Sequence, residues 1–153
     1  MLSTADIWLR LLSALACGAL IGLNRDLHHK PAGVRTFTLV CVASALTVLA
    51  VKQAAGDGPD SDAVSRVIQG LMTGIGFLGA GVILHRPPDT QVSGLTTAAA
   101  IWMTAGLGVA AALGQFTIVW SSLALAMFAL LVGRQVERFF KRWLGHSSEE
   151  PPP

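Results

Sequence analysis

Apolar residues form long uninterrupted runs in this chain, and charged residues are confined to the short stretches between them. A helix of about 20 apolar residues crosses the ~30 Å hydrocarbon core of a bilayer. The pattern therefore predicts an all-α integral membrane protein with about five transmembrane helices, which form one domain over residues 1–135. The runs lie at about 7–23, 37–51 (extendable to 55), 67–84, 95–114 and 116–133.

The third run is rich in glycine, since five of the twelve residues from Gly70 to Gly81 are glycines. Each glycine in a helix interior costs about 1 kcal/mol relative to alanine, so the run predicts a role that side chains would prevent. We expect close packing against another helix, within one chain or between two. The alternative is a locally opened helix whose carbonyls line a polar cavity. With a glycine pair in the first run, the expected packing residues are Gly18, Gly22, Gly70, Gly74, Gly76, Gly79 and Gly81.

Lysine and arginine are divided unevenly between the two ends of the predicted helices. With the N-terminus outside, eight of the eleven basic residues lie on the cytoplasmic side, whereas Lys52 and Arg66 lie on the outer side. The positive-inside rule therefore predicts an external N-terminus and a cytoplasmic C-terminus. Because the uneven distribution of basic residues reflects topology, the net charge of +2 says little about partners. We expect contact with the lipid bilayer and none with nucleic acid.

The two ends of the chain and its cysteines complete the predicted organisation. No basic residue precedes the first run, which predicts a retained helix and not a secretory signal. We expect residues 136–153 to form a basic amphipathic juxtamembrane segment and a disordered tail, with no C-terminal soluble domain. Cys17 and Cys41 lie inside predicted spans as buried, inert thiols. Arg10 also lies inside a span and is expected to pair with Asp6.

Polar residues next to the spans supply the candidate functional chemistry. Thr96 and Thr97 begin the fourth run, where hydroxyls cap a helix or bond across helices. No Asp or Glu lies at the centre of a span, so a dehydrated carboxylate site for Mg²⁺ is not expected, and neither is an enzyme. A hydrated Mg²⁺ ion needs only one or two carboxylates. The predicted cation path or polar cluster consists of Arg25, Asp26, Arg35, Asp62, Arg66, Thr96 and Thr97, with Asp26 as the candidate metal ligand.

Three sequence blocks, in this order, resemble the MgtC/SapB family of bacterial inner-membrane proteins. The first holds the glycine pair of the first run and the charged loop after it. The second is the glycine-rich third run, and the third begins the fourth run. The blocks are Gly18–Asp26 with Lys30–Thr36, then Arg66–Ile83, then Gly94–Trp102, and the resemblance extends over roughly residues 10–135.

The resemblance implies an all-helical protein of the bacterial inner membrane that is associated with magnesium limitation and, in some pathogens, with survival inside host cells. It implies either magnesium homeostasis through passage of Mg²⁺, or a non-transporting regulator that docks onto another membrane complex such as the proton-driven ATP synthase. We expect no tightly bound cofactor, Mg²⁺ as the transported or sensed ion, and a homo-oligomer, most simply a dimer.

The chain departs from the usual family pattern at two positions. Asn24 stands where the family usually has a glutamate, so a site built on two acids is reduced to Asp26. Ala63 stands where an acid commonly precedes the arginine of the third span, and Asp62 lies one residue earlier. The pairing of Asp62 with Arg66 therefore does not follow from the family pattern.

Overall fold

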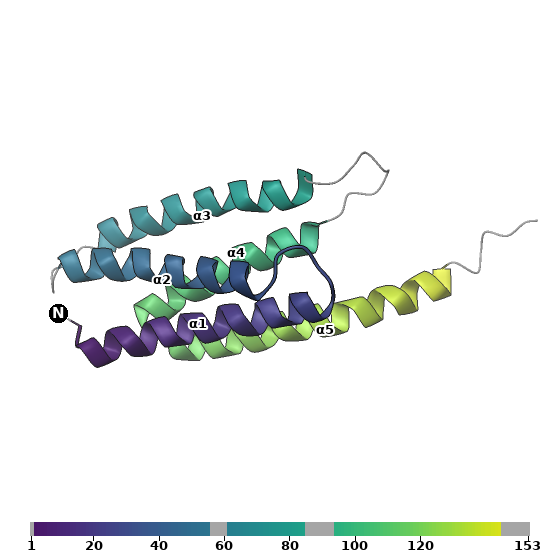
Figure 1. Ribbon diagram of the computed structural model, residues 1–153, viewed down its shortest axis with the longest axis horizontal. Coiled ribbons are helices and arrows are strands. Elements are labelled where there is room, and N and C mark those ends of the chain that lie inside the picture. Colours follow the sequence, from purple (N-terminus) through teal and green to yellow (C-terminus); the bar gives the residue numbers. More distant parts are fainter. Residues whose placement is uncertain (1, 56–60, 85–93, 145–153) are drawn as a thin grey trace, which may run out of the picture.

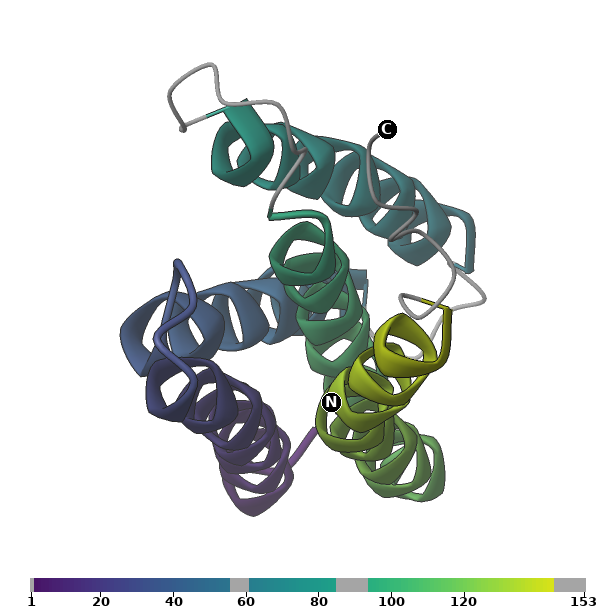
Figure 2. The same ribbon diagram turned by 90° about the vertical axis from the view of Figure 1, so that its right-hand side faces the viewer.

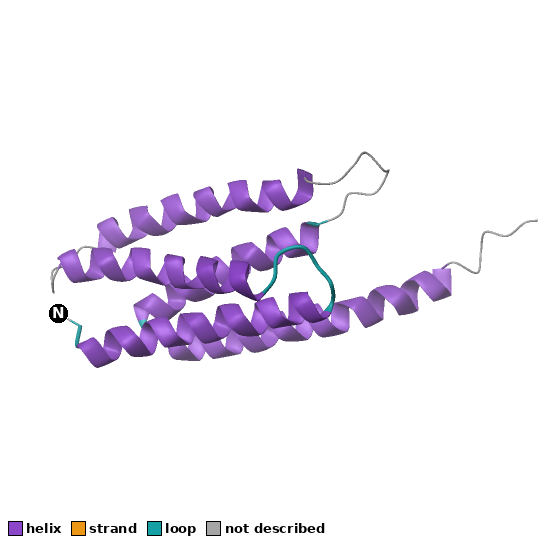
Figure 3. Cartoon of the chain, in the orientation of Figure 1, coloured by secondary structure: helices purple, strands orange, loops and turns teal. Residues whose placement is uncertain are grey.

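Five helices make up the described part of the chain, which comprises residues 2–55, 61–84 and 94–144 of the computed structural model (Figure 1). Each is long and apolar enough to cross a membrane. The prediction of an all-α membrane protein is therefore confirmed, and no strand occurs in these three segments (Figure 3). The helices are α1 (Thr4–Leu27), α2 (Val34–Ala55), α3 (Ser61–Leu84), α4 (Leu95–Leu113) and α5 (Phe116–Leu144).

Several helices extend beyond the apolar runs because local signals decide where they begin and end. α1 begins early because Ser3 and Asp6 form a capping box, in which each side chain accepts a backbone N–H of the other residue. α4 ends at Leu113 because the next residue, Gly114, has a φ of 77°, a left-handed conformation that glycine adopts without strain. α5 continues beyond its apolar run through the basic segment and ends at Leu144.

α4 is the centre of the bundle and contacts each of the other four helices (Figure 2). In its membrane-length stretch 61% of the residues are buried, compared with 11% in α5 and 6% in α3. Alanine and glycine occupy much of α4, and such small residues let neighbouring backbones approach closely. α3 and α5 are therefore outer helices.

The core lies mainly between α1, α2 and α4. Phe37, Ile21 and Ile101 are its largest fully buried apolar side chains, one from each of these helices. The free thiols of Cys17 and Cys41 are buried there too, which confirms their predicted burial. This core holds the C-terminal end of α1 in a fixed place for the candidate site.

Candidate functional site

The antiparallel order of the helices brings the end of α1 and the starts of α2 and α4 to the same end of the bundle (Figure 1). Arg25 lies in the last turn of α1, and Thr97 lies in the first turn of α4. The Nη2 group of Arg25 donates a hydrogen bond of 2.6 Å to Thr97 Oγ1, although the two residues are 72 positions apart. The structure thus joins two of the predicted polar residues directly. We call this pair, with Asn24 and Asp26, the end cluster.

The centre of the end cluster is buried. Arg25 is 4% exposed, Thr97 is 1% exposed and Asn24 is 6% exposed. A buried charge is costly unless hydrogen bonds compensate for the lost water, and bonds from a charged donor are among the stronger ones. The Arg25–Thr97 hydrogen bond therefore fixes the end of α1 against the start of α4. Thr96, the neighbour of Thr97, is exposed.

Asp26 has a structural role at the start of α2. Its Oδ2 atom accepts a 2.9 Å hydrogen bond from the backbone N–H of Val34, one of the N–H groups that lack a partner inside their own helix. A carboxylate at a helix start also interacts favourably with the helix dipole. Gly33 makes room for it, because a Cβ atom at that position would overlap the Asp26 carboxylate. Asp26 and Arg35, which follows in the first turn of α2, are both exposed.

Asp62 and Arg66 lie away from the end cluster. Both are exposed and lie in the first two turns of α3, which starts at the opposite end of the bundle (Figure 1). A helix of this length separates its ends by roughly 35 Å at 1.5 Å per residue. The seven predicted polar residues are therefore divided between the two ends, and a cation path that joins them stays a prediction.

Arg10 fixes the other end of α1. Its Nη1 group donates to the backbone carbonyl of Ala112 in the last turn of α4, and its guanidinium lies beside Gly114. A cation is favourable there because the last carbonyls of a helix carry partial negative charge. Asp6, the partner expected from the sequence, forms its hydrogen bonds with Ser3. The charge of Arg10 also acts on the Asp6 carboxylate, and its hydrogen bond adds a contact between α1 and α4 that the sequence did not predict.

The glycines of the first run lie where α1 passes closest to α2. A Cβ atom on Gly18 would lie 2.7 Å from the carbonyl oxygen of Phe37, and one on Gly22 would lie 2.5 Å from Val34 Cα. Real Cβ atoms essentially never approach backbone atoms so closely. Both glycines therefore sit in a packed contact between helices of the same chain.

The glycines of the third run behave differently. Gly79 faces Ala98 of α4, where an added Cβ would make an ordinary contact of 3.5 Å. At the other four positions an added Cβ would meet no described atom within 4 Å. α3 is also a continuous helix, so the alternative of a locally opened helix is not what the structure shows. The four glycines without a neighbour are Gly70, Gly74, Gly76 and Gly81.

Sequence reasoning missed two glycines that position the site. Gly33 accommodates the Asp26 carboxylate, and Gly108 allows α4 to cross α2, since a Cβ atom there would overlap the carbonyl of Cys41. The small-residue pattern around Gly106 and Gly108 was a usable signal for a packed helix. For Gly33 no comparable signal exists, because its requirement comes from a side chain seven residues earlier.

The chemistry of the end cluster is that of a buried cation beside an exposed carboxylate. Within the three described segments, no group of three or more His, Cys, Asp or Glu side chains is placed to hold a metal ion. Asp26 alone can contact a hydrated Mg²⁺ through the water ligands that this ion retains. Arg25, the preceding residue, carries a buried positive charge, and a nearby positive charge weakens the attraction of a carboxylate for a bare cation.

Comparison with known proteins places these features in a family. Residues 11–139 match the MgtC family. SrpB of Synechococcus elongatus is 45% identical over 148 residues, which cover 92% of this chain and 80% of SrpB. The putative magnesium transporter YhiD of Escherichia coli is 39% identical over 145 residues, which cover 88% of this chain and 66% of YhiD. No solved structure matches the chain significantly.

The family match includes every element that builds the site. Protein MgtC of Salmonella typhimurium is 38% identical over 127 residues, which cover 83% of this chain. The aligned part is only 52% of that protein, so the chain spans about half of its length. The matched residues 11–139 contain the end cluster, the α1–α2 glycines and the whole of α3 and α4. The chain belongs to the MgtC family.

Proposed function

We propose that this protein serves magnesium homeostasis in the bacterial inner membrane, with its N-terminus outside and its C-terminus in the cytoplasm. The observation that carries the proposal is family membership over residues 11–139, together with a relative that bears the name putative magnesium transporter. The orientation rests on the positive-inside rule, which places the end cluster at the cytoplasmic surface.

In its concrete form, the proposal is that Mg²⁺ passes the membrane with Asp26 at the cytoplasmic mouth. The exposed carboxylate supports this role, since hydrated Mg²⁺ is held through one or two such groups. The Arg25–Thr97 hydrogen bond holds the last turn of α1, which presents this carboxylate. The bond that Val34 N–H donates to Asp26 holds the same turn to the start of α2.

A second function, a non-transporting regulator that docks onto another membrane complex, is favoured by the packing of α4. The buried hydroxyls at its centre and at the centre of α2 are bonded within their own helices: Thr104 donates to Ala100 O at 2.7 Å, and Ser44 donates to Val40 O at 2.7 Å. The protons of these hydroxyls are therefore used within the helices, and only the lone pairs of two oxygens face the surroundings. An ion that crossed beside α4 would find little else that is polar there, because the surrounding core is apolar.

Flux of Mg²⁺ into proteoliposomes separates the two functions. The purified full-length chain is reconstituted with a Mg²⁺-sensitive dye inside the vesicles, under an imposed gradient and membrane potential. Asp26→Asn removes the charge but keeps a side-chain carbonyl oxygen that can accept the Val34 N–H. Asp26→Ala removes both the charge and the cap.

If Asp26 meets the ion, both variants lose most of the flux, although only Asp26→Ala loses stability. Asp6→Asn is the matched control, because that carboxylate also caps a helix but lies at the opposite end of α1. Equal flux in Asp26→Asn and Asp6→Asn would refute Asp26 as the mouth. Folded protein with no flux above empty vesicles would refute passage and favour the regulator, and capture of the docked complex would then be the next measurement.

A further inference from the structure

One flank of α3 combines open glycines with a single strongly exposed aromatic side chain. The inward side of α3 packs on the core through a series of apolar side chains. Positions 70, 74, 77 and 81 recur at helical spacing and share one flank of the helix, roughly a third of a turn around from that inward side. Three of these are glycines with open space around them. The fourth, Phe77, is 83% exposed, which is more than any other large apolar side chain described. The inward residues are Val64, Val67, Ile68, Leu71, Met72, Ile75 and Val82.

Contact with lipid alone does not explain this surface. α5 shows what a lipid-facing side looks like in this protein, since large side chains such as Leu125, Phe128 and Leu131 are exposed along it. Glycine on such a side forgoes apolar contact and costs about 1 kcal/mol relative to alanine in a helix interior. No helix of the same chain comes close to Gly70, Gly74 or Gly81 in the described residues. These glycines therefore leave room for close packing of a helix from another molecule.

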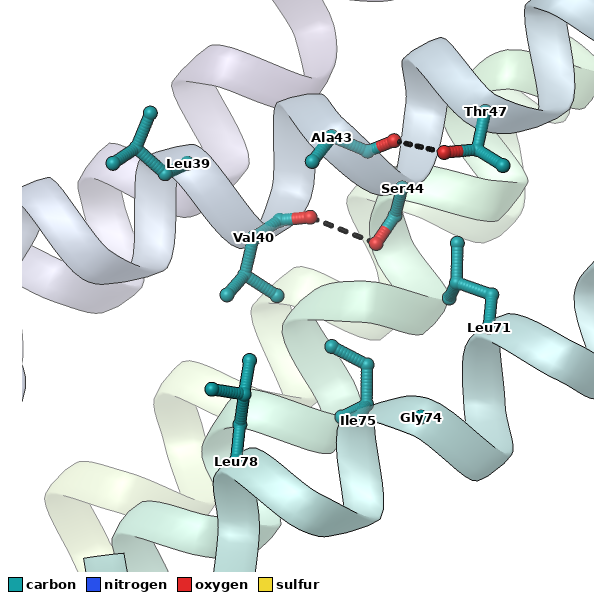
Figure 4. A pocket seen from close by; sticks show the side chains of 9 residues that line it. All are labelled: Leu39, Val40, Ala43, Ser44, Thr47, Leu71, Gly74, Ile75 and Leu78. Atoms are coloured by element: carbon teal, nitrogen blue, oxygen red, sulfur yellow. Dashed lines mark hydrogen bonds between the residues drawn. The ribbon is translucent and has the colours of Figure 1, made fainter. Parts of the chain in front are cut away.

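A groove runs beside this surface between α2 and α3 (Figure 4). Its volume is about 360 Å³, whereas a cavity of about 150 Å³ already holds a benzene ring. Gly74 lines it, with Leu71, Ile75 and Leu78 of α3 pointing towards α2 (Figure 4). Its two hydroxyls, from Ser44 and Thr47, donate to carbonyls of α2 itself. The groove therefore suits an apolar ring and not a polar ligand.

We infer that α3 is the seam of a homodimer, in which Phe77 of each copy packs against the glycine side of the other copy and enters its α2–α3 groove over Gly74. We take all copies to insert in the membrane in the same direction, so the twofold axis of a dimer is parallel to the membrane normal. The same residue of the two copies then lies at the same depth in the membrane. Phe77 lies one helical turn from both Gly74 and Gly81. The projecting ring and the space for it are thus at the same depth, as a self-complementary surface requires.

This inference does not rest on magnesium passage, and its test measures assembly only. Full-length protein is labelled with a fluorophore and reconstituted in phosphatidylethanolamine–phosphatidylglycerol vesicles at increasing lipid dilution, and the dimer fraction is counted by single-molecule photobleaching. Gly74→Leu fills space that is open within one copy, so the monomer should fold, but it blocks the seam and lowers dimer affinity by about tenfold or more. Gly133→Leu is the matched control, because Gly133 is equally open but lies on α5.

Oxidative cross-linking in the same vesicles is a second, independent test of which residues lie at the dimer interface. Phe77→Cys should form a disulfide between copies, whereas Leu125→Cys, which is 70% exposed on α5, should not. The native thiols do not interfere, since Cys17 and Cys41 are both 0% exposed. Wild-type protein that stays monomeric at high protein density would overturn the inference in favour of a foreign partner. Equal dimer affinity in Gly74→Leu and Gly133→Leu, or equal cross-linking at the two cysteine positions, would overturn it in favour of another seam.

Discussion

Replacement of Thr97 by valine tests whether the Arg25 hydrogen bond stabilises the bundle. Valine keeps the branched shape of the side chain but removes the Oγ1 atom that accepts from Arg25 Nη2 at 2.6 Å. Both residues are almost fully buried, so water does not readily replace the lost acceptor. The substitution thus removes one defined contact between α1 and α4.

The expected cost follows from this geometry. A hydrogen bond to a charged group contributes about 1.5–3 kcal/mol, and the additional buried methyl group of valine returns about 0.8 kcal/mol. Thr97→Val should therefore lower the free energy of unfolding by about 1–2 kcal/mol. Thr104→Val is the matched control, because Thr104 is also buried in α4 but donates to Ala100 O in its own helix. Its neutral bond contributes only about 0.5–1.5 kcal/mol, which the methyl group roughly offsets.

The measurement is reversible unfolding of the full-length protein in mixed micelles by increasing SDS, followed by far-UV circular dichroism. The two variants should differ by about 1.4 kcal/mol, which is about a tenfold change in the folding equilibrium. Thr97→Ser, which keeps the acceptor oxygen, should recover most of the difference. If Thr97→Val costs no more than Thr104→Val, the Arg25–Thr97 bond does not hold the end cluster together.

Two further predictions concern the contacts of α1 and the open side of α3. Gly18→Ala should lower the unfolding free energy in the same assay by about 1–3 kcal/mol, because its Cβ would press on α2 backbone. In contrast, Gly70→Ala, with open space around it, should raise the unfolding free energy by about 0.5–1 kcal/mol. Changes of the same sign in Gly18→Ala and Gly70→Ala would contradict this reasoning. Arg10→Met should cost about 1–2 kcal/mol through the lost contact with the α4 C-terminus. The exposed control Arg66→Met should stay within about 0.5 kcal/mol of wild type.

The helices could be predicted from the sequence because hydrocarbon thickness and the scarcity of charge leave few alternatives. The five apolar runs correspond to the five observed helices. The ends were less predictable, since they depend on local groups such as the Ser3–Asp6 capping box and the left-handed Gly114. The order in which helices pack was not predictable either. An apolar run is hydrophobic on all sides, so its sequence does not indicate which side of the helix packs against α4.

In the candidate site, too, the sequence identified polar residues but not their contacts with other helices. Arg25 and Thr97 were both selected from the sequence, but their contact spans 72 positions and depends on the bundle. Arg10 shows that local reasoning is incomplete. The nearby Asp6 was identified as its partner, but the sequence could not identify the carbonyl of Ala112, which lies 102 positions away. Small residues were likewise identified without their partners: Gly18 is pressed against α2, whereas Gly70 faces open space.

The placement of these contacts implies that assembly and the chemistry of the end cluster are separable. α1 is attached to both ends of α4, by Arg10 at one end and by Arg25 at the other. α3 has no role in either attachment, and few residues of its span are buried. A second copy that binds along α3 therefore leaves the Arg25–Thr97 contact intact. Substitution of Gly74 should change the dimer fraction without changing the exposure of Asp26, whereas substitution of Thr97 should loosen the end cluster in monomer and dimer alike. Within one copy α3 reaches the end cluster through its packing on the start of α4, where Gly79 faces Ala98. A magnesium-dependent activity that responds to both substitutions would therefore require the dimer as well as the cluster, or would depend on this α3–α4 contact.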